Sequence, residues 1–176
     1  MKQDPDGRQI LQDKPRINSE TWNLDCLLTL PDNTFGHEYA FFMTSHGYTS
    51  DERPLVKYVP DLEHAYILQR YKEVHDMAHV LLGYGTSVAE EIAVKWFEMQ
   101  QTHLPMSALS AFVGPMNLLL FQKNSAEFLK LQQVYLPHIM QNAKTSKMFL
   151  NVYFEKHFET PLDELRKDLK ITPLKK

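Results

Sequence analysis

Apolar residues recur every three or four positions along most of the chain, which is the spacing of one face of an α-helix. The clearest run begins at Asp61 and ends at Gly83, a residue type that commonly follows a helix C-terminus. A second helix is expected from Ser87, which opens a capping box with Glu90, to about Gln101. Because the connection between them is short, we expect these two helices to run antiparallel.

The remaining segments follow the same period and are separated by proline, glycine and other turn residues. Residues 46–60 form the longest predicted loop, and residues 151–154 resemble a strand that has no strand partner. The fold class is therefore predicted to be all-α, as a single compact helical domain over residues 1–176. Its further helices are expected from Asp4-Pro5 to just before Pro15, over residues 20–28 with Ser19 as cap, over 34–45, over 125–142 with a kink at Pro137, and from Thr160-Pro161 to near Thr172-Pro173.

A tract without charge follows the second of the two clear helices. No Asp, Glu, Lys or Arg stands between Glu98 and Lys123, and the most apolar part is residues 104–121. A membrane-spanning helix needs about 20 mostly apolar residues without a break. This tract barely reaches that length, and Gly114-Pro115 interrupts it. We expect two short helices, buried or facing lipid, and a protein that is soluble or peripheral to a membrane.

Composition narrows the function classes. The chain has 176 residues, of which 43% are hydrophobic, so it can build a core and is not a disordered segment. A net charge of −3 argues against a nucleic-acid partner, which usually requires a basic excess. Cys26 is the single cysteine and cannot form an internal disulfide, while there are 8 histidines. A bound metal would therefore have nitrogen and oxygen ligands.

Four residues form a candidate metal motif. His75 and His79 are four positions apart on the clearest predicted helix, so their imidazoles lie on one face. Asp76 lies about 100° around that helix from His75 and either ligates the metal directly or orients a histidine. Glu91, one turn into the next helix, can face His79. Two histidines and two carboxylates, with room for water, suit Zn²⁺ or Fe²⁺ at a catalytic site.

The alternative interpretation is that His75 and His79 are ordinary histidines of an amphipathic helix. The added aspartate, the double-glycine connection and the facing carboxylate favour a metal. A zinc protease would have Glu instead of Asp76. A di-iron bundle would need Glu-x-x-His on two separate helices. A mononuclear site therefore fits best.

Two cations near the motif are candidates for binding an anionic group of a substrate. Lys95 follows Glu91 by one helical turn, so it either forms a salt bridge with that carboxylate or holds a substrate carboxylate. Arg70 precedes His75 on the same helix and is either solvated or part of the substrate site.

The run RYKEVHDMAHVLLGYGTSVAEEIAVKWFEMQQTHLPM resembles the fourth protein of the numbered coenzyme Q biosynthesis series. That family is marked by His-Asp-x-x-His, eleven residues and then Glu, and these are His75, Asp76, His79 and Glu91 here. The similarity extends from DPDGRQILQDKPRI through FVGPMNL to LNVYFEKHFETPLDELRKDLKIT. It therefore covers most of the chain.

The resemblance implies an all-α fold and a divalent metal, usually zinc, at those four positions. It implies a mitochondrial protein, peripheral to the matrix face of the inner membrane, that removes the C1 carboxylate from a polyprenylated hydroxybenzoate and replaces it with hydroxyl. It also implies that other coenzyme Q biosynthesis enzymes are partners and are organised into a complex. Family members have a targeting segment and a further helix upstream, so we expect this chain to be a shortened form.

These expectations combine into one mechanism and one rival. The expected enzyme is a carbon–carbon lyase, a metal-dependent C1 decarboxylase with hydroxylation as a coupled step, in which Asp76 or Glu91 handles a proton. The prenyl tail is expected along residues 104–121, and a second copy of the chain is a further partner considered. The rival is a scaffold that binds polyprenyl lipid and partner enzymes, with a metal that only braces the helix pair.

Overall fold

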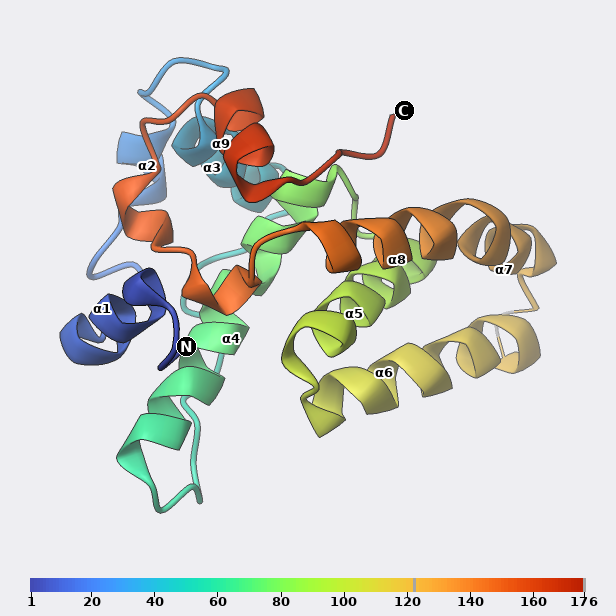
Figure 1. The fold of residues 1–176 in the computed structure, drawn as a ribbon. Helices are drawn as coiled ribbons and strands as arrows, with labels where there is room; N and C mark the ends of the chain where they lie inside the picture. The colour runs from blue at the N-terminus through green and yellow to red at the C-terminus, as the bar shows by residue number, and fades with distance from the viewer. Residues whose placement is uncertain (122, 176) are drawn as a thin grey trace. The chain divides into compact units, whose positions relative to one another are not determined.

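The computed structural model describes residues 1–121 and 123–175 (Figure 1). At Phe121 it describes the backbone only. The described residues form helices and no β-strand, apart from one isolated antiparallel bridge between Thr34 and Pro161. The predicted all-α fold is therefore confirmed. The elements are α1 (Pro5–Asp13), α2 (Leu24–Leu27), α3 (Phe35–Ser45), α4 (Leu62–Leu82), α5 (Val88–Thr102), α6 (Pro105–Met116), η1 (Asn117–Phe121), α7 (Ser125–Lys130), η2 (Leu131–Tyr135), α8 (Leu136–Thr145), η3 (Phe149–Asn151), η4 (Phe154–Lys156) and α9 (Leu162–Leu169).

The chain divides into two compact units. Unit 1 contains residues 1–80 and 148–168, and unit 2 contains residues 81–147 and 169–176. The division falls within α4 and at the end of α9, so both helices contribute to both units. The sequence-based expectation of one domain over residues 1–176 stays a prediction.

The core of unit 1 is a cluster of aromatic rings. Phe35 on α3 stacks on Phe158 with ring centroids 5.8 Å apart and lies 5.6 Å from Phe154. Phe149 contacts Phe154 at 5.2 Å, and Tyr39 stacks on Phe158 at 6.3 Å. Aromatic pairs at these distances add to the stabilisation from burial. The cluster therefore joins the returning segment 148–158 to α3.

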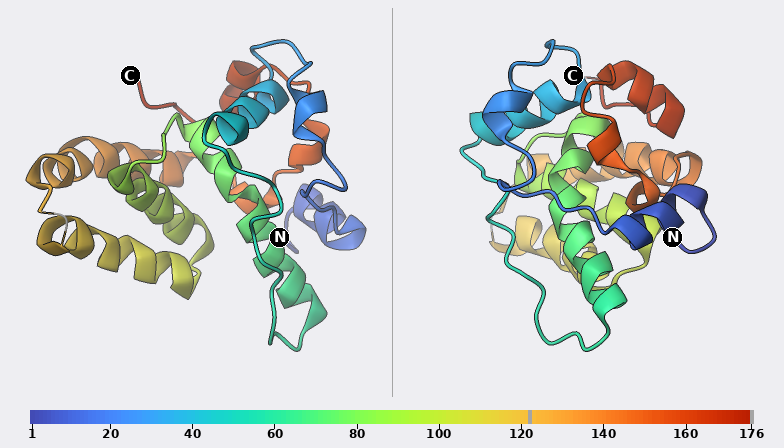
Figure 2. Two further views of the ribbon diagram at one scale, coloured as in Figure 1. Left: turned by 180° about the vertical axis from the view of Figure 1, so that it is seen from behind. Right: turned by 90° about the vertical axis from the view of Figure 1, so that its left-hand side faces the viewer.

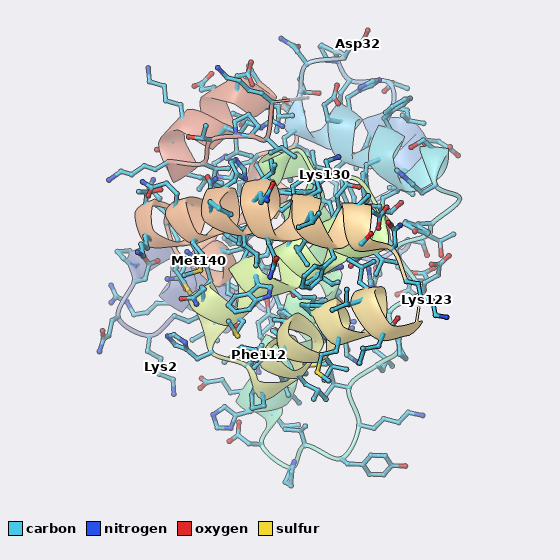
Figure 3. The ribbon with its side chains drawn as sticks, turned by 90° about the vertical axis from the view of Figure 1, so that its right-hand side faces the viewer. Lys2, Asp32, Phe112, Lys123, Lys130 and Met140 are labelled. Carbon is cyan, nitrogen blue, oxygen red and sulfur yellow. The ribbon has the colours of Figure 1, made fainter. Side chains whose placement is uncertain are left out.

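Unit 2 is built around α5, which packs against both α6 and α8 (Figures 1 and 2). Figure 3 views this unit from the side, with Phe112 labelled on α6 and Lys130 on α7. The contact between α5 and α6 is close at Gly114, where an added Cβ would lie 2.6 Å from Cγ1 of Ile92. A glycine is therefore required for this approach of the two helices.

The uncharged tract does not break where the sequence predicts. Instead of two helices separated at Gly114-Pro115, α6 continues through Pro115 to Met116 and passes directly into the π-helical turn η1. Pro115 has no N–H to donate to the carbonyl oxygen of Ala111, four residues earlier. The indole N–H of Trp96 donates to that oxygen at 2.9 Å. A side chain from α5 thus supplies the hydrogen bond that the proline removes.

The length and hydropathy of the helices can be compared with those of a membrane span. Among the described residues, no helix is both long enough and apolar enough to cross a membrane.

Three smaller expectations were wrong. The helix predicted over residues 20–28 is only α2, because Asn18 and Thr21 bond each other's backbone N–H groups and compete with a helical turn. The segment 151–154 is not a strand, because Asn151 ends one 3₁₀ turn and Phe154 begins the next. The last helix stops at Leu169 because Lys170 has φ +57°.

Candidate metal centre

The two histidines of the motif converge within α4. Both side chains are buried, His75 at 3% and His79 at 0% exposure. Their Nε2 atoms lie 3.4 Å apart, and the two rings meet edge to face with centroids 5.0 Å apart. The ring of His79 also stacks on Phe42 of α3 at 5.5 Å. The four-residue spacing therefore brings two buried imidazole nitrogens together.

The connection after α4 positions the motif's glutamate. Gly83 has φ +76°, a conformation that favours glycine, and ends α4. Ser87 then caps α5. Its side-chain oxygen accepts a hydrogen bond from the N–H of Glu90, and the carboxylate of Glu90 accepts one from the N–H of Ser87. Glu91 follows in the first turn of α5, where its N–H donates to the carbonyl oxygen of Ser87 at 2.9 Å. The predicted capping box is thus confirmed, and it fixes the residue before Glu91.

Glu90 itself serves the connection. Its carboxylate also accepts from the N–H of Gly85 at 3.0 Å. Burial works against the charged form, but the hydrogen bonds from Gly85 and Ser87 outweigh it and lower the pKa of Glu90. Of the two adjacent glutamates, Glu90 is therefore committed to the cap.

Three side chains between residues 75 and 91 are close enough together to ligate one metal ion. His75, His79 and half-buried Glu91 each offer one ligand atom, and these atoms all lie within 4.8 Å of one another. Two imidazole nitrogens and one carboxylate oxygen are the protein ligands of many catalytic zinc sites, in which water or substrate completes the sphere. The donor set therefore fits a divalent metal, and metal binding stays a prediction.

Asp76 has a different partner. Its side chain is 8% exposed, and Oδ1 accepts a hydrogen bond from Nη2 of Arg53 at 2.7 Å. Arg53 comes from the 46–60 loop, so no helical period in the sequence could have indicated it. Burial raises the pKa of neighbouring Tyr39 to about 12, which keeps that phenol neutral near Asp76. Within the described residues, Asp76 is therefore paired with a cation and lies outside the three-residue group.

Arg70 lies in the interior of unit 1. Its side chain is 1% exposed and bonds the carboxylate of Glu155 at 2.8 Å and the carbonyl oxygen of Val152 at 2.8 Å. A guanidinium in this environment braces the returning segment against α4. The placement favours a structural role over the substrate-binding role expected from sequence.

Lys95 lies on α5, where its Nζ contacts the buried carboxylate of Glu98 at 2.8 Å. Lys95 and Glu91 both line a cavity of about 440 Å³ within unit 2, between α5 and α6. The other lining residues are mostly apolar. They are Thr86, Val88, Ile92, Leu109, Ser110, Val113, Gly114 and Asn117.

This cavity brings the motif residue Glu91 together with residues of the uncharged tract. Glu91 and Lys95 are one helical turn apart and both contribute to its wall. The contribution of α5 was missed, although Val88 and Ile92 show the four-residue spacing that could have indicated it. The result is an apolar cavity with two charged groups in its wall.

Comparison with known proteins agrees with the resemblance found in the sequence. The family described as coenzyme Q (ubiquinone) biosynthesis protein Coq4 matches residues 1–175. The Paramecium tetraurelia protein named "Ubiquinone biosynthesis protein COQ4 homolog 2, mitochondrial" is 51% identical, over 97% of this chain and 79% of that protein. A COQ4 homolog of Nematostella vectensis, also named mitochondrial, is 46% identical over 100% of this chain and 84% of its own length. The human homolog is 43% identical, and 63% of its length is covered.

A solved structure shares the fold. The crystal structure of a protein from Nostoc punctiforme has a TM-score of 0.78, with 22% identity, over 96% of this chain and 76% of the other. The family matches nearly the whole sequence, and the identity to the first two relatives extends over most of their own length. These findings lead to one conclusion. The chain belongs to the coenzyme Q (ubiquinone) biosynthesis protein Coq4 family.

Proposed function

We propose that this chain acts in ubiquinone biosynthesis in the mitochondrion, as a metal-dependent C1 decarboxylase of a 4-hydroxy-3-methoxy-5-polyprenylbenzoate. Family membership supports the pathway, and the names of the relatives support the organelle. The observation that carries the enzymatic proposal is the group of His75, His79 and Glu91, whose ligand atoms all lie within 4.8 Å of one another. Glu91 also lines an apolar cavity.

His75, His79 and Glu91 would hold the divalent metal, for which zinc is our first choice and Fe²⁺ or another first-row ion the alternative. When bound, the metal supplies a Lewis acid for an oxygen of the ring carboxylate or of the neighbouring phenol. The buried imidazoles exclude water from one side of the site. Glu91 belongs to both the ligand group and the cavity wall, so it connects the two parts of the site.

The cavity suits the prenyl tail. Its volume of about 440 Å³ is within the range of small-molecule sites, and the accessible surface of its wall is mainly apolar. Burial of apolar surface stabilises a bound tail by roughly 25 cal/mol per Å². Lys95, in the same wall, is placed to attract the carboxylate at the other end of the substrate. With the tail along α6 and the ring near Glu91, the tail contacts apolar side chains and the substrate carboxylate is close enough for Lys95 to attract it.

Decarboxylation breaks the bond between C1 and the carboxylate, releases carbon dioxide and leaves an electron pair that takes up a proton at C1. From the sequence, Asp76 or Glu91 was expected to handle this proton. Asp76 is paired with Arg53, whereas Glu91 lines the cavity, so we assign to Glu91 the orientation of the solvent water that supplies this proton, through the carboxylate oxygen that does not hold the metal. Replacing the proton by hydroxyl requires an external oxidant such as O₂ in addition.

A scaffold role has its own support. Large apolar side chains of α6 are exposed, including Leu109 at 66% and Phe112 at 59%, and Figure 3 labels Phe112. Exposed apolar patches mark membrane or protein contacts. This exposure favours peripheral attachment, which we propose is to the matrix side of the inner membrane. Other coenzyme Q biosynthesis enzymes and a second copy of the chain are the protein partners that this face could also bind.

Turnover separates the two functions. The metal-supplied wild type, incubated with the C1-carboxylated polyprenylbenzoate, should release carbon dioxide. Glu91→Gln removes a ligand of the proposed metal site together with a carboxylate that takes part in proton transfer, so it should reduce the rate by about 100-fold or more. Glu159→Gln, which removes the same charge from an exposed position, is the matched control and should retain full activity. Equal rates in wild type and Glu91→Gln, or no release from a protein that still binds the lipid, would favour the scaffold.

A further inference from the structure

The imidazole of His79 lies against an aromatic ring of α3. It stacks on the phenyl ring of Phe42, with ring centroids 5.5 Å apart and an angle of 28° between the ring planes. His79 is fully buried, and Phe42, in the last turn of α3, is half-buried. Both residues belong to unit 1, so the contact is a feature of that unit alone.

Phe42 is supported in turn by the residues that follow it. The ring of His46 lies 4.7 Å from the phenyl ring, and the ring of Tyr48 stacks on His46 at 5.6 Å. Nδ1 of His46 donates to the carbonyl oxygen of Phe42 at 2.7 Å, and the N–H of Tyr48 donates to that of Met43 at 2.9 Å. Gly47 has φ +70°, which permits the chain to reverse between the two rings. Phe42 therefore contacts His79 from a position that the end of α3 determines.

The orientation of an imidazole needs such a contact. The torsion χ2, which turns the ring about its bond to Cβ, has broad minima in histidine, so the side chain alone does not fix the ring plane. The ring of His75 meets that of His79 at 83°, whereas the ring of Phe42 is nearly parallel to it. Turning the His79 ring about χ2 would drive its edge into the phenyl ring. The stacked ring is therefore suited to hold the plane of the imidazole.

We propose that Phe42 is a positioning residue that fixes the plane of the His79 imidazole and keeps its Nε2 beside Nε2 of His75, 3.4 Å away, before an ion binds. This inference rests on the metal site of the proposed function and adds to it a residue of α3, outside the motif. A phenyl ring carries no ligand atom, so the contribution of Phe42 to metal affinity comes through His79.

The test uses the full chain, with the neighbouring phenylalanine as the matched control. Phe42→Leu removes the flat ring and keeps an apolar side chain, whereas Phe42→Tyr keeps the ring. Phe41→Leu makes the same exchange one position earlier, where the side chain is 58% exposed. Zinc affinity is measured by competition with a chelator. The ring-proton signals of His79 are measured by NMR on the metal-free protein at one fixed pH and are assigned with His79→Gln.

Phe42→Leu should lower zinc affinity about 10-fold or more, the loss typical when the support of a ligating histidine is removed. Its His79 signals should move, because the imidazole no longer lies against the ring current of a phenyl group. Phe42→Tyr should have the zinc affinity of the wild type, and Phe41→Leu should match the wild type in both measurements. A side chain that only stabilised the fold would change the melting temperature and leave the zinc affinity of the folded protein unaltered.

Two results overturn the proposal. One is equal zinc affinity in Phe42→Leu and Phe41→Leu, and the other is an equal loss in Phe42→Leu and Phe42→Tyr, since a retained ring should be sufficient. If Phe42→Leu does not fold, Phe42→Met replaces it with a flexible side chain and should show the same loss. A wild type that binds no zinc, with no effect of His75→Ala, overturns the proposed metal site itself and is thereby distinguished from a failure of Phe42 alone.

Discussion

Nε2 of His75 and Nε2 of His79 lie 3.4 Å apart on α4, with both side chains buried. At most one hydrogen bond can join two ring nitrogens in this arrangement, and it requires one ring to donate and the other to accept. A metal ion between them would bind the lone pair of both nitrogens. The pair is therefore the structural basis of the proposed site.

Trp96 is expected to stabilise α6 through the carbonyl oxygen of Ala111. Trp96→Phe keeps an aromatic ring but leaves that oxygen without its 2.9 Å donor, so the free energy of unfolding should fall by about 1–3 kcal/mol. Urea denaturation measures the loss. Pro115→Ala restores a backbone N–H that can reach Ala111, and it should recover part of the stability of Trp96→Phe. A double variant as unstable as the sum of the two single changes would refute this account.

Gly114 is expected to be required by packing. In Gly114→Ala the new Cβ would lie 2.6 Å from Cγ1 of Ile92, so α6 must shift or Ile92 must move. Overpacking of this kind costs typically 1–3 kcal/mol. Thermal denaturation of Gly114→Ala, Ile92→Ala and the double variant gives the coupling, which should be clearly less than additive. Strict additivity would show that the two residues are independent.

The cap residue Glu90 is expected to make stability depend on acid pH. Its folded-state pKa is lowered, so its contribution is complete above the unfolded-state value of about 4.3 and disappears as pH falls through the folded-state value. Glu90→Gln should cost about 1 kcal/mol at pH 7 and less below pH ~4. Denaturation across pH 3–7 tests this, with Glu159→Gln as control. A cost that stays constant with pH would contradict the electrostatic explanation.

Arg70 is expected to act on stability and not on substrate affinity. Arg70→Met leaves Glu155 with a buried unpaired charge, and breaking a buried pair in this way costs about 3–5 kcal/mol. Adding Glu155→Gln should recover a large part of that loss in urea denaturation. If the Arg70→Met protein folds and its KM for the carboxylated substrate rises more than 10-fold, the earlier substrate-binding prediction for Arg70 is restored.

Sequence periodicity was sufficient for the parts of the fold that depend on neighbouring residues. The helix from Asp61 to Gly83, the Ser87 capping box and the shared face of His75 and His79 all follow from local spacing. The continuation of α6 through Pro115 could not be predicted, because it depends on a hydrogen bond from Trp96 on another helix.

The same limit applies to the candidate site. Glu91 could be assigned to the histidine pair because a four-residue connection joins α4 to the cap of α5. Arg53 is 23 positions before Asp76 and lies in a loop without periodicity, so nothing in the sequence indicated their pairing. Conversely, Arg70 precedes the motif in the same helix but is enclosed by the distant segment containing Glu155.

Metal content tests the central claim most directly. The full chain, supplied with zinc and then dialysed, should retain about one equivalent of metal by elemental analysis, as expected for one site with three protein ligands. Glu91→Gln should lose most of it, whereas His64→Ala, which changes an exposed histidine of the same helix, should keep it. A wild type that retains no metal, or a Glu91→Gln protein that retains as much as the wild type, would contradict the assignment of His75, His79 and Glu91 as the metal centre.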